Sequence, residues 1–262
     1  PGLSWETLDE THGRLQPGID EEHVRLALER LKRRYGLNIT TREPSLAVRE
    51  TVRKGATQRG RHKKQSGGHG QYGDVVIELR PLARGEGFVF EDRITGGVVP
   101  KQWIPAVEHG VRDAMEKGPL GCRVVDVAVT LTDGSYHTVD SSELAFRTAG
   151  RIAMSEALAA SAPYLLEPIA HVRIHAPGTA TSRVTSAISS ARGRVLDLSP
   201  REGWSRWDTV EAQVPEAELR TLATDLKSIS QGMATFEARF DHLAEVSGRL
   251  AEQIIQRTSE PA

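Results

Sequence analysis

The stretch Arg61-His62-Lys63-Lys64-Gln65-Ser66-Gly67-Gly68-His69-Gly70-Gln71-Tyr72-Gly73-Asp74-Val75-Val76-Ile77-Glu78-Leu79 decides how the middle of this chain folds. It begins with clustered cations, passes through four glycines and ends in a strand pattern of period two over 74–79. Glycines permit positive φ and let a backbone approach another polymer closely. The stretch therefore predicts a glycine-rich loop that leads into a half-buried strand.

The residues that follow this strand alternate between strand and helix patterns. A partner strand is expected at 88–94, and apolar residues then recur at helical spacing over 104–115, up to Gly118-Pro119. A second alternating strand is predicted at 125–131 before the turn dipeptide Asp133-Gly134. A longer helix is predicted over about 142–160, with Ser141 as its N-cap.

The C-terminal third of the chain has the order strand, helix, strand, strand, helix, strand. This βαββαβ order is the ferredoxin-like split βαβ pattern. A last amphipathic segment is predicted at 246–257. The six predicted elements of the pattern are 169–176, 179–191, 194–199, 209–214, 216–229 and 235–241.

The N-terminal part predicts half of a small α+β domain. An amphipathic helix is expected at 21–35, where Gly36 ends it. Strand material is expected within 3–15, and 37–48 has an extended pattern with a bend at Pro44. The order strand, helix, strand suggests a unit that is cut short at its N-terminus.

Composition narrows the class of protein. The 262 residues are 38% hydrophobic and 26% charged, with a net charge of −1, which is typical of a globular chain with two or three cores. No stretch has the ~20 consecutive apolar residues of a membrane span, and the first residues lack a signal-peptide pattern. Cys122 is the single cysteine, so disulfide scaffolds are excluded. We expect a cytoplasmic protein.

The sequence lacks the motifs of several catalytic sites. It contains neither a G-x-x-x-x-G-K-[ST] loop nor a G-x-G-x-x-G loop that opens a helix, and no zinc-ligand spacing. His171 and His175 are interpreted as surface residues of one strand, and Cys122 as a structural thiol. A self-contained nucleotide or metal site is therefore not expected.

Two segments remain as candidates for function. From Arg49 to Lys64 there are seven Lys or Arg residues and one acid, which favours contact with the phosphates of a nucleic acid, although such runs are also common on solvated surfaces. The loop 133–142 contains Ser135 and His137, but these are too close in sequence to assemble a catalytic triad easily.

Three segments closely resemble domain IV of the translation elongation factor G family. They are Arg61–Gly73, Thr95-Gly96-Gly97-Val98-Val99-Pro100-Lys101 and Asp133-Gly134-Ser135-Tyr136-His137-Thr138-Val139-Asp140-Ser141-Ser142-Glu143-Leu144-Ala145-Phe146. Upstream, Leu28-Glu29-Arg30-Leu31 and 35–51 are similar to the end of the third domain of the family. Downstream, Leu165-Leu166-Glu167-Pro168, Arg192-Gly193-Arg194, Ser230-Gln231-Gly232 and Phe240-Asp241-His242 are similar to its fifth domain.

The resemblance implies an α+β, multidomain fold in which ferredoxin-like (βαββαβ) units flank an elongated α+β domain with a left-handed βαβ element. Four parts are expected: a partial ferredoxin-like third domain, a fourth domain whose tip enters the ribosomal decoding site, a ferredoxin-like fifth domain, and a C-terminal helix and tail that pack back on the fourth. Their expected bounds are 1–48, 49–164, 165–245 and 246–262.

The resemblance also implies a role in moving tRNA and mRNA on the ribosome. The expected partners are the ribosome (rRNA, tRNA and mRNA) and the protein's own N-terminal GTPase domain, with no membrane. The chain itself is expected to carry no catalytic residue, metal or cofactor, whereas GTP and Mg belong to the full-length protein. The residues expected to contact tRNA or rRNA at the tip are Ser66, Gly67, Gly68, His69, Gly70, Gln71, Ser135, Tyr136 and His137, with Arg59, Arg61, Lys63 and Lys64 forming a basic stem that faces RNA.

The chain departs from the family pattern at two places. The family usually has Ser-Gly-Met-Gly-Glu-Leu-His where this chain has Pro17-Gly18-Ile19-Asp20-Glu21-Glu22-His23, and His69 replaces a common arginine. These departures suggest a paralogue. The alternatives are a ribosomal protection or recycling factor of the same superfamily, a stand-alone RNA-binding protein, and a small hydrolase that uses Ser135 and His137. The first residue is Pro1 rather than Met, so we expect a fragment whose GTPase domain lies upstream.

Overall fold

The computed structural model describes residues 6–8, 13–15, 21–37, 47–65 and 70–259, which belong to two units, 1–47 and 48–262. In the first unit, β1 (Glu6–Leu8) and β2 (Gly13–Leu15) form an antiparallel hairpin. The predicted helix is confirmed as α1 (Glu21–Tyr35), and Gly36 ends it at φ +67°. The extended segment expected at 37–48 falls mostly on 38–46, outside the described residues.

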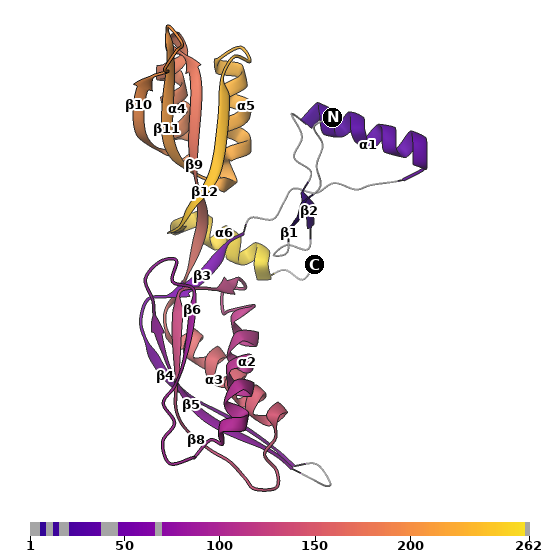
Figure 1. The fold of residues 1–262 in the computed structure, drawn as a ribbon, viewed down its shortest axis with the longest axis vertical. Helices are drawn as coiled ribbons and strands as arrows, with labels where there is room; N and C mark the ends of the chain where they lie inside the picture. The colour runs from indigo at the N-terminus through magenta and orange to yellow at the C-terminus, as the bar shows by residue number, and fades with distance from the viewer. Residues whose placement is uncertain (1–5, 9–12, 16–20, 38–46, 66–69, 260–262) are drawn as a thin grey trace. The chain divides into compact units, whose positions relative to one another are not determined.

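The second unit contains a four-stranded sheet in the order β4-β5-β8-β6 (Figure 1). The strands β4, β5 and β8 are antiparallel neighbours, whereas β6 runs parallel to β8. The basic run of the sequence forms the short strand β3 and all of β4. The bounds are β3 (Arg49–Val52), β4 (Ala56–Lys64), β5 (Gln71–Pro81), β6 (Phe88–Asp92) and β8 (Val127–Ser135).

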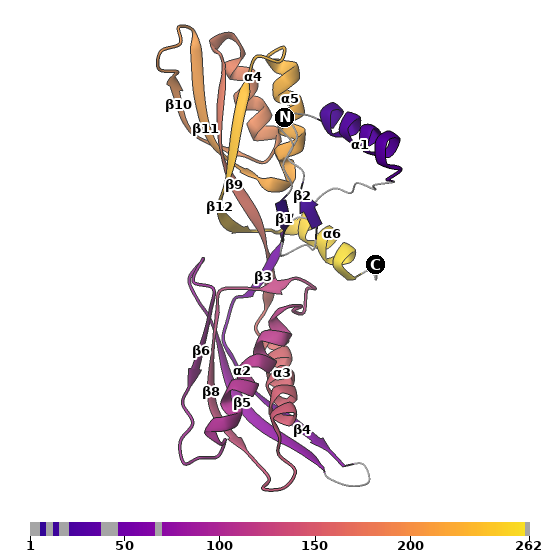
Figure 2. The ribbon, with the colours of Figure 1, turned by 45° about the vertical axis from the view of Figure 1, so that its right-hand side comes forward.

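Two helices, α2 (Ile104–Met115) and α3 (Glu143–Ala160), lie side by side on this sheet (Figures 1 and 2). A single-turn 3-10 helix, η1 (Lys101–Trp103), precedes α2. The core between helices and sheet contains fully buried side chains such as Ile77, Leu131 and Phe146. Burial of these apolar faces stabilises this half of the unit.

A second sheet follows the ferredoxin-like order that the sequence predicts for the C-terminal third. Its strands lie in the order β10-β11-β9-β12, all antiparallel, and α4 and α5 supply the apolar side chains that complete its core. Two further single-turn 3-10 helices precede α4 and α5. The bounds are β9 (Pro163–Pro177), η2 (Gly178–Ala180), α4 (Thr181–Ser190), β10 (Arg194–Pro200), β11 (Trp207–Pro215), η3 (Glu216–Glu218), α5 (Leu219–Ile229) and β12 (Thr235–Glu245).

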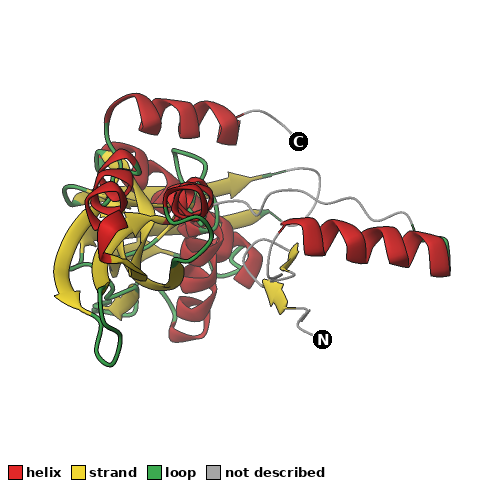
Figure 3. Cartoon of the chain, turned by 90° about the horizontal axis from the view of Figure 1, so that it is seen from above, coloured by secondary structure: helices red, strands yellow, loops and turns green. Residues whose placement is uncertain are grey.

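The strand β9 connects the two halves of this unit. Its first residues pair with β3, and the rest pair with β11 and β12. The short strand β7 (Arg123–Val124) extends the sheet beside β3. Beyond β12, α6 (Gly248–Ser259) places Leu250 and Ile254 in an apolar cluster with Leu120 and Cys122. Both units contain helices as well as strands (Figure 3). No helix among the described residues has the length and apolarity needed to cross a membrane.

Several local predictions differ from the structure. The turn expected at Asp133-Gly134 lies inside β8, because both residues pair with β5, and the strand expected at 169–176 begins at Pro163 as β9, because its first residues pair with β3. The N-cap of α3 is Ser142, whose side chain accepts from the amide of Ala145, rather than Ser141. The strand predicted from residue 125 begins at Val127 instead, because Asp126 adopts a φ of +58° and interrupts the extended backbone.

Glu50 on β3 is a buried acid whose carboxyl group has few hydrogen bonds. Its side chain is 1% exposed, and Oε2 accepts from the amide of Leu120 at 2.8 Å, while Oε1 has no hydrogen-bond partner among the described residues. Burial raises the pKa of Glu50 to about 7, although backbone hydrogen bonds from Leu120 and Cys122 partly oppose this. Burial and the nearby Glu50 also raise the pKa of Cys122 to about 11, which keeps this thiol protonated.

Glu50→Gln should remove a pH-dependent loss of stability. The folded state binds the proton of the Glu50 carboxyl group more tightly than the unfolded chain does. Ionised Glu50 therefore lowers the free energy of unfolding by about 3 kcal/mol, and this loss develops as pH rises from about 4.5 to about 7. Urea denaturation of the 262-residue chain at pH 4.5 and 7.5 measures this. Glu78→Gln, an exposed glutamate on β5, is the matched control. An equal pH response of the two variants would contradict the assignment.

Gly110→Ala should destabilise the contact of α2 with α3. A Cβ on Gly110 would lie 1.9 Å from the carbonyl oxygen of Arg147, a backbone atom that cannot move alone. We expect a loss of about 1–3 kcal/mol of unfolding free energy, measured by chemical denaturation. Gly178→Ala is the control, because the nearest atom there is 3.4 Å away. Equal stability of the two variants would show that the helices separate at little cost.

Candidate nucleic-acid interface

The hairpin β4–β5 and the end of β8 bring Gly70, which precedes β5, close to the loop 136–142 at one end of the first sheet. Lys64 pairs with Gln71 at the last register position of the hairpin, and Asp74 pairs with Ser135 where β8 ends. The segments 65–70 and 136–142 follow these positions. Gly70 and Asp140, which are 70 residues apart in the sequence, are therefore neighbours.

Backbone contacts of Tyr72 join the loop 136–142 to β5. The Tyr72 amide donates to the carbonyl oxygen of Asp140 at 2.8 Å, and the Ser141 hydroxyl donates to the carbonyl oxygen of Tyr72 at 2.8 Å. Tyr72 and Ser141 also form an isolated parallel bridge. The 136–142 loop thus adds a short strand-like contact to the edge of β5.

His137 lies on the second loop with its side chain half-exposed. The amides of Val139 and Asp140 donate to Nδ1 at 3.3 and 3.2 Å, and the amide of His137 itself donates to the Ser141 hydroxyl. Within the described residues, all hydrogen bonds of this ring use Nδ1. Nε2 is therefore the ring nitrogen that can bind an external partner.

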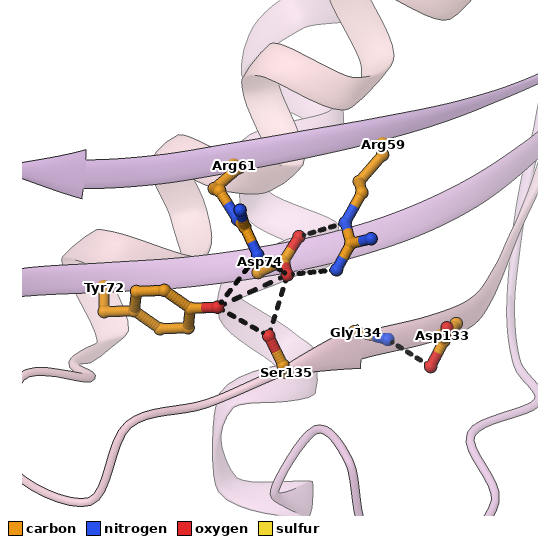
Figure 4. A network of polar contacts seen from close by, with 7 residues as sticks. All are labelled: Arg59, Arg61, Tyr72, Asp74, Asp133, Gly134 and Ser135. Atoms are coloured by element: carbon orange, nitrogen blue, oxygen red, sulfur yellow. Dashed lines mark hydrogen bonds and ion pairs between the residues drawn. The ribbon is translucent and has the colours of Figure 1, made fainter.

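Asp74 on β5 is the centre of a polar network behind these loops (Figure 4). Its carboxylate is completely buried and accepts from Arg59 Nε at 2.7 Å and from the Ser135 hydroxyl at 2.7 Å. Arg59 Nη2 completes a bidentate pair, and Arg61 Nη2 lies 3.3 Å from Oδ2. The Tyr72 hydroxyl bonds to Ser135 at 2.7 Å. One buried acid thus orients side chains from β4, β5 and β8.

The network determines how the Arg59 and Arg61 charges face solvent. Burial alone would raise the pKa of Asp74, but the hydrogen bonds from Arg59 and Ser135 and the two guanidinium charges outweigh it and hold that pKa below its ordinary value. The hydrogen bond to Asp74 raises the pKa of Arg59. Both guanidiniums remain half-exposed. Asp74 therefore holds both guanidinium groups in fixed orientations, and its single negative charge neutralises one of their two positive charges.

Lys63 and Lys64 carry the uncompensated charge of the stem. Both side chains are exposed at the end of β4, and neither has an ion-pair partner in the described part of the chain. By contrast, Arg53 of the same basic run forms an ion pair with Glu245 at 2.6 Å. Two charges of the run that have no ion-pair partner among the described residues thus lie beside Gly70 and the loop 136–142, where they favour binding of a polyanion.

An aromatic cluster supports the second loop from behind. The ring of Tyr136 contacts Trp103 edge-on with centroids 6.1 Å apart, and Trp103 stacks on the buried Phe146 at 5.1 Å. Tyr136 is 45% exposed, so one part of the ring anchors the loop while the rest faces solvent.

The structure brings together the predicted residues that it describes. Gly70, Gln71, Ser135, Tyr136 and His137 lie at the joined loops, and Arg59, Arg61, Lys63 and Lys64 lie on β4, whereas Ser66, Gly67, Gly68 and His69 lie outside the described residues. Ser135 bonds to Asp74 and Tyr72, and His137 to loop amides, so these two residues do not form the nucleophile and base of a hydrolase.

Sequence reasoning missed Asp74 and Trp103. Asp74 is the first residue of the apolar strand pattern, and its role depends on pairing with a strand that the sequence does not show clearly. A usable signal is the spacing of Arg59 and Arg61, because residues two apart on a strand share a face and two cations there require an acid on the neighbouring strand.

Family models match most of the chain. Residues 44–162 match the model of elongation factor G, domain IV, and residues 164–254 match that of the elongation factor G C-terminus. The chain therefore belongs to the elongation factor G family and contains domain IV and the C-terminal domain V of that family.

Individual relatives agree with this assignment. The chain is 48% identical over 254 residues to the elongation factor G-like protein of Synechocystis sp., and 44% identical over 256 residues to elongation factor G of Aquifex pyrophilus. Each match covers 97% of this chain but only 38% and 36% of the relative, so the chain spans little more than a third of their length. A crystal structure of a Thermus thermophilus protein matches with a TM-score of 0.89 at 38% identity, covering 99% of this chain and 38% of that one.

Asp74→Asn should loosen the loops by weakening the network. The amide keeps the volume but loses the charge that pairs with Arg59, so we expect a loss of about 2 kcal/mol at pH 7. Because the pKa of Asp74 is lowered in the folded state, the wild-type advantage should vanish as pH falls below the ordinary value of about 3.9.

Urea denaturation between about pH 2.5 and 7 tests this, with the exposed Asp133→Asn on β8 as the matched control. If the two variants lose equal stability at pH 7, the network around Asp74 contributes no more than a surface carboxylate.

Proposed function

We propose that this chain is the ribosome-binding C-terminal portion of an elongation-factor-G-like translational GTPase that promotes movement of tRNA and mRNA during protein synthesis. The observation that carries the proposal is the contact of Gly70 and Tyr72 with the loop 136–142, beside Lys63 and Lys64, at one end of the first sheet. In this proposal the joined loops are the tip that enters the decoding site.

The groups at this tip suit an RNA duplex. Proteins recognise A-form RNA mainly through its shape, phosphates and 2′-hydroxyls, so contacts that do not depend on sequence are needed where codons and anticodons change. The exposed ring of Tyr136 and Nε2 of His137 supply such contacts. Ser66, Gly67, Gly68 and His69 belong to the same proposed surface on sequence grounds.

The proposal also assigns the remaining parts of the protein. Residues 1–48 would be the end of domain III, 49–164 domain IV, 165–245 domain V, and 246–262 a helix and tail that pack on domain IV. The contacts of Leu250 and Ile254 with Leu120 and Cys122 support this last assignment. GTP and Mg²⁺ would bind a GTPase domain elsewhere in a cytoplasmic full-length protein, and not this chain.

His137→Ala in the full-length protein should slow translocation about tenfold while ribosome-stimulated GTP turnover changes less than about twofold. Loss of one tip hydrogen bond to RNA affects the movement and leaves the distant nucleotide site intact. Single-turnover translocation on programmed ribosomes and phosphate release measure the two rates. His109→Ala, an exposed histidine on α2, is the matched control.

Three outcomes would contradict the proposal in different ways. Equal loss of both rates would remove the tip role of His137. Ribosome splitting or drug release without any translocation would indicate the recycling or protection alternative. RNA binding by a protein that has no nucleotide-binding domain in its complete reading frame would indicate the stand-alone alternative.

A further inference from the structure

One side chain, that of Asp140, contacts both loops of the tip. Its Oδ1 accepts from the amide of Gly70 at 3.0 Å, across 70 residues of sequence. Its Oδ2 lies 3.4 Å from Nδ1 of His137, but this nitrogen accepts from the amides of Val139 and Asp140 and so donates no hydrogen bond to the carboxylate. The carboxylate therefore holds Gly70, and the main-chain amide of the same residue holds the imidazole.

The carboxylate of Asp140 lies in the space that a Cβ on residue 70 would take. A Cβ on Gly70 would lie 2.8 Å from Cγ of Asp140 and 2.9 Å from its Oδ2. A methyl group there would displace the carboxylate, since the end of a side chain moves more easily than the backbone. Glycine at position 70 and aspartate at position 140 thus form a matched pair.

The backbone of Asp140 reinforces this placement. Its carbonyl oxygen accepts from Tyr72 and its amide donates to Nδ1 of His137. The side chain is 29% exposed, which makes the charge-assisted hydrogen bond to Gly70 stronger than it would be in open water. Side chain and main chain of one residue therefore contact Gly70, Tyr72 and His137 at once.

We propose that Asp140 is a positioning residue that couples Gly70 to His137, so that these two residues meet RNA in a fixed arrangement. This inference rests on the proposed function. Asp140 itself does not touch RNA in this account. Its carboxylate holds the Gly70 amide and its main-chain amide holds Nδ1 of His137, so that Nε2 is presented in one direction to a hydrogen-bond acceptor on the RNA backbone.

The contact can be tested in the 262-residue chain without any ribosome. Amide exchange measured by NMR should show the Gly70 amide protected in the wild type and exchanging about tenfold faster in Asp140→Ala. Asp140→Asn should keep most of the protection, because its side-chain oxygen can still accept. Equal exchange in the wild type and Asp140→Ala, at unchanged thermal stability, overturns the inference.

The coupling is tested in the full-length protein by translocation rates. Asp140→Ala and Gly70→Ala should each lower the maximal rate about tenfold, with less than about a twofold change in the factor concentration that gives half of it. Asp140→Asn should restore most of the rate. Combined with His137→Ala, Asp140→Ala should add less than about a twofold further loss, because its effect passes through His137.

The results separate this inference from the proposed function. If His137→Ala slows translocation and Asp140→Ala does not, or if the two losses multiply, the positioning role is wrong and the proposed function stands. If His137→Ala has no effect on translocation, the proposed function fails, and the coupling of the loops to RNA movement fails with it.

Discussion

The rest of the second unit depends on the strand β9, which pairs with strands of both halves of that unit. At about 3.3 Å per residue, the 15 residues of β9 extend about 50 Å, long enough to pair with β3 at one end and with β11 and β12 at the other. Buried backbone groups must be hydrogen-bonded, so the partners of β9 have little choice of register. The junction between the two domains is therefore fixed by main-chain pairing, and side chains only reinforce it.

The side-chain contacts at this junction add little stability to the main-chain pairing. Arg53 pairs with Glu245 and lies 4.2 Å from the centre of the Tyr164 ring, while Arg84 bonds to the Tyr164 hydroxyl at 2.9 Å. The Arg53 pair is exposed to solvent, where such bridges contribute little. Glu50 even opposes stability at neutral pH, because its pKa is raised by burial. The pairing of β9 and the apolar cluster around Cys122 and α6 must therefore carry the junction.

At the proposed tip, polar side-chain contacts matter more than they do at the junction, because exposed loops bury little apolar surface that could order them. The buried charge of Asp74 fixes Arg59, and Asp140 links Gly70 to His137. Lys63 and Lys64 are left with their full charge. Arg59 therefore helps to define the shape of the surface, whereas Lys63 and Lys64 attract a polyanion. This arrangement is consistent with a surface that must stay rigid against RNA.

The sequence by itself determined the elements and the family. Period-two strands, the helix at 21–35 and the βαββαβ order follow from local patterns of apolar residues and from Gly36, and the segments around Tyr72 and His137 identify elongation factor G. Only the tertiary structure decided which polar groups meet. Strand β4, the bend at Asp126 and the contacts of Asp74 and Asp140 all depend on register between segments about 15 to 70 residues apart. Local periodicity carries no information about such pairings, because they are set by the simultaneous satisfaction of backbone hydrogen bonds and core packing across the whole sheet.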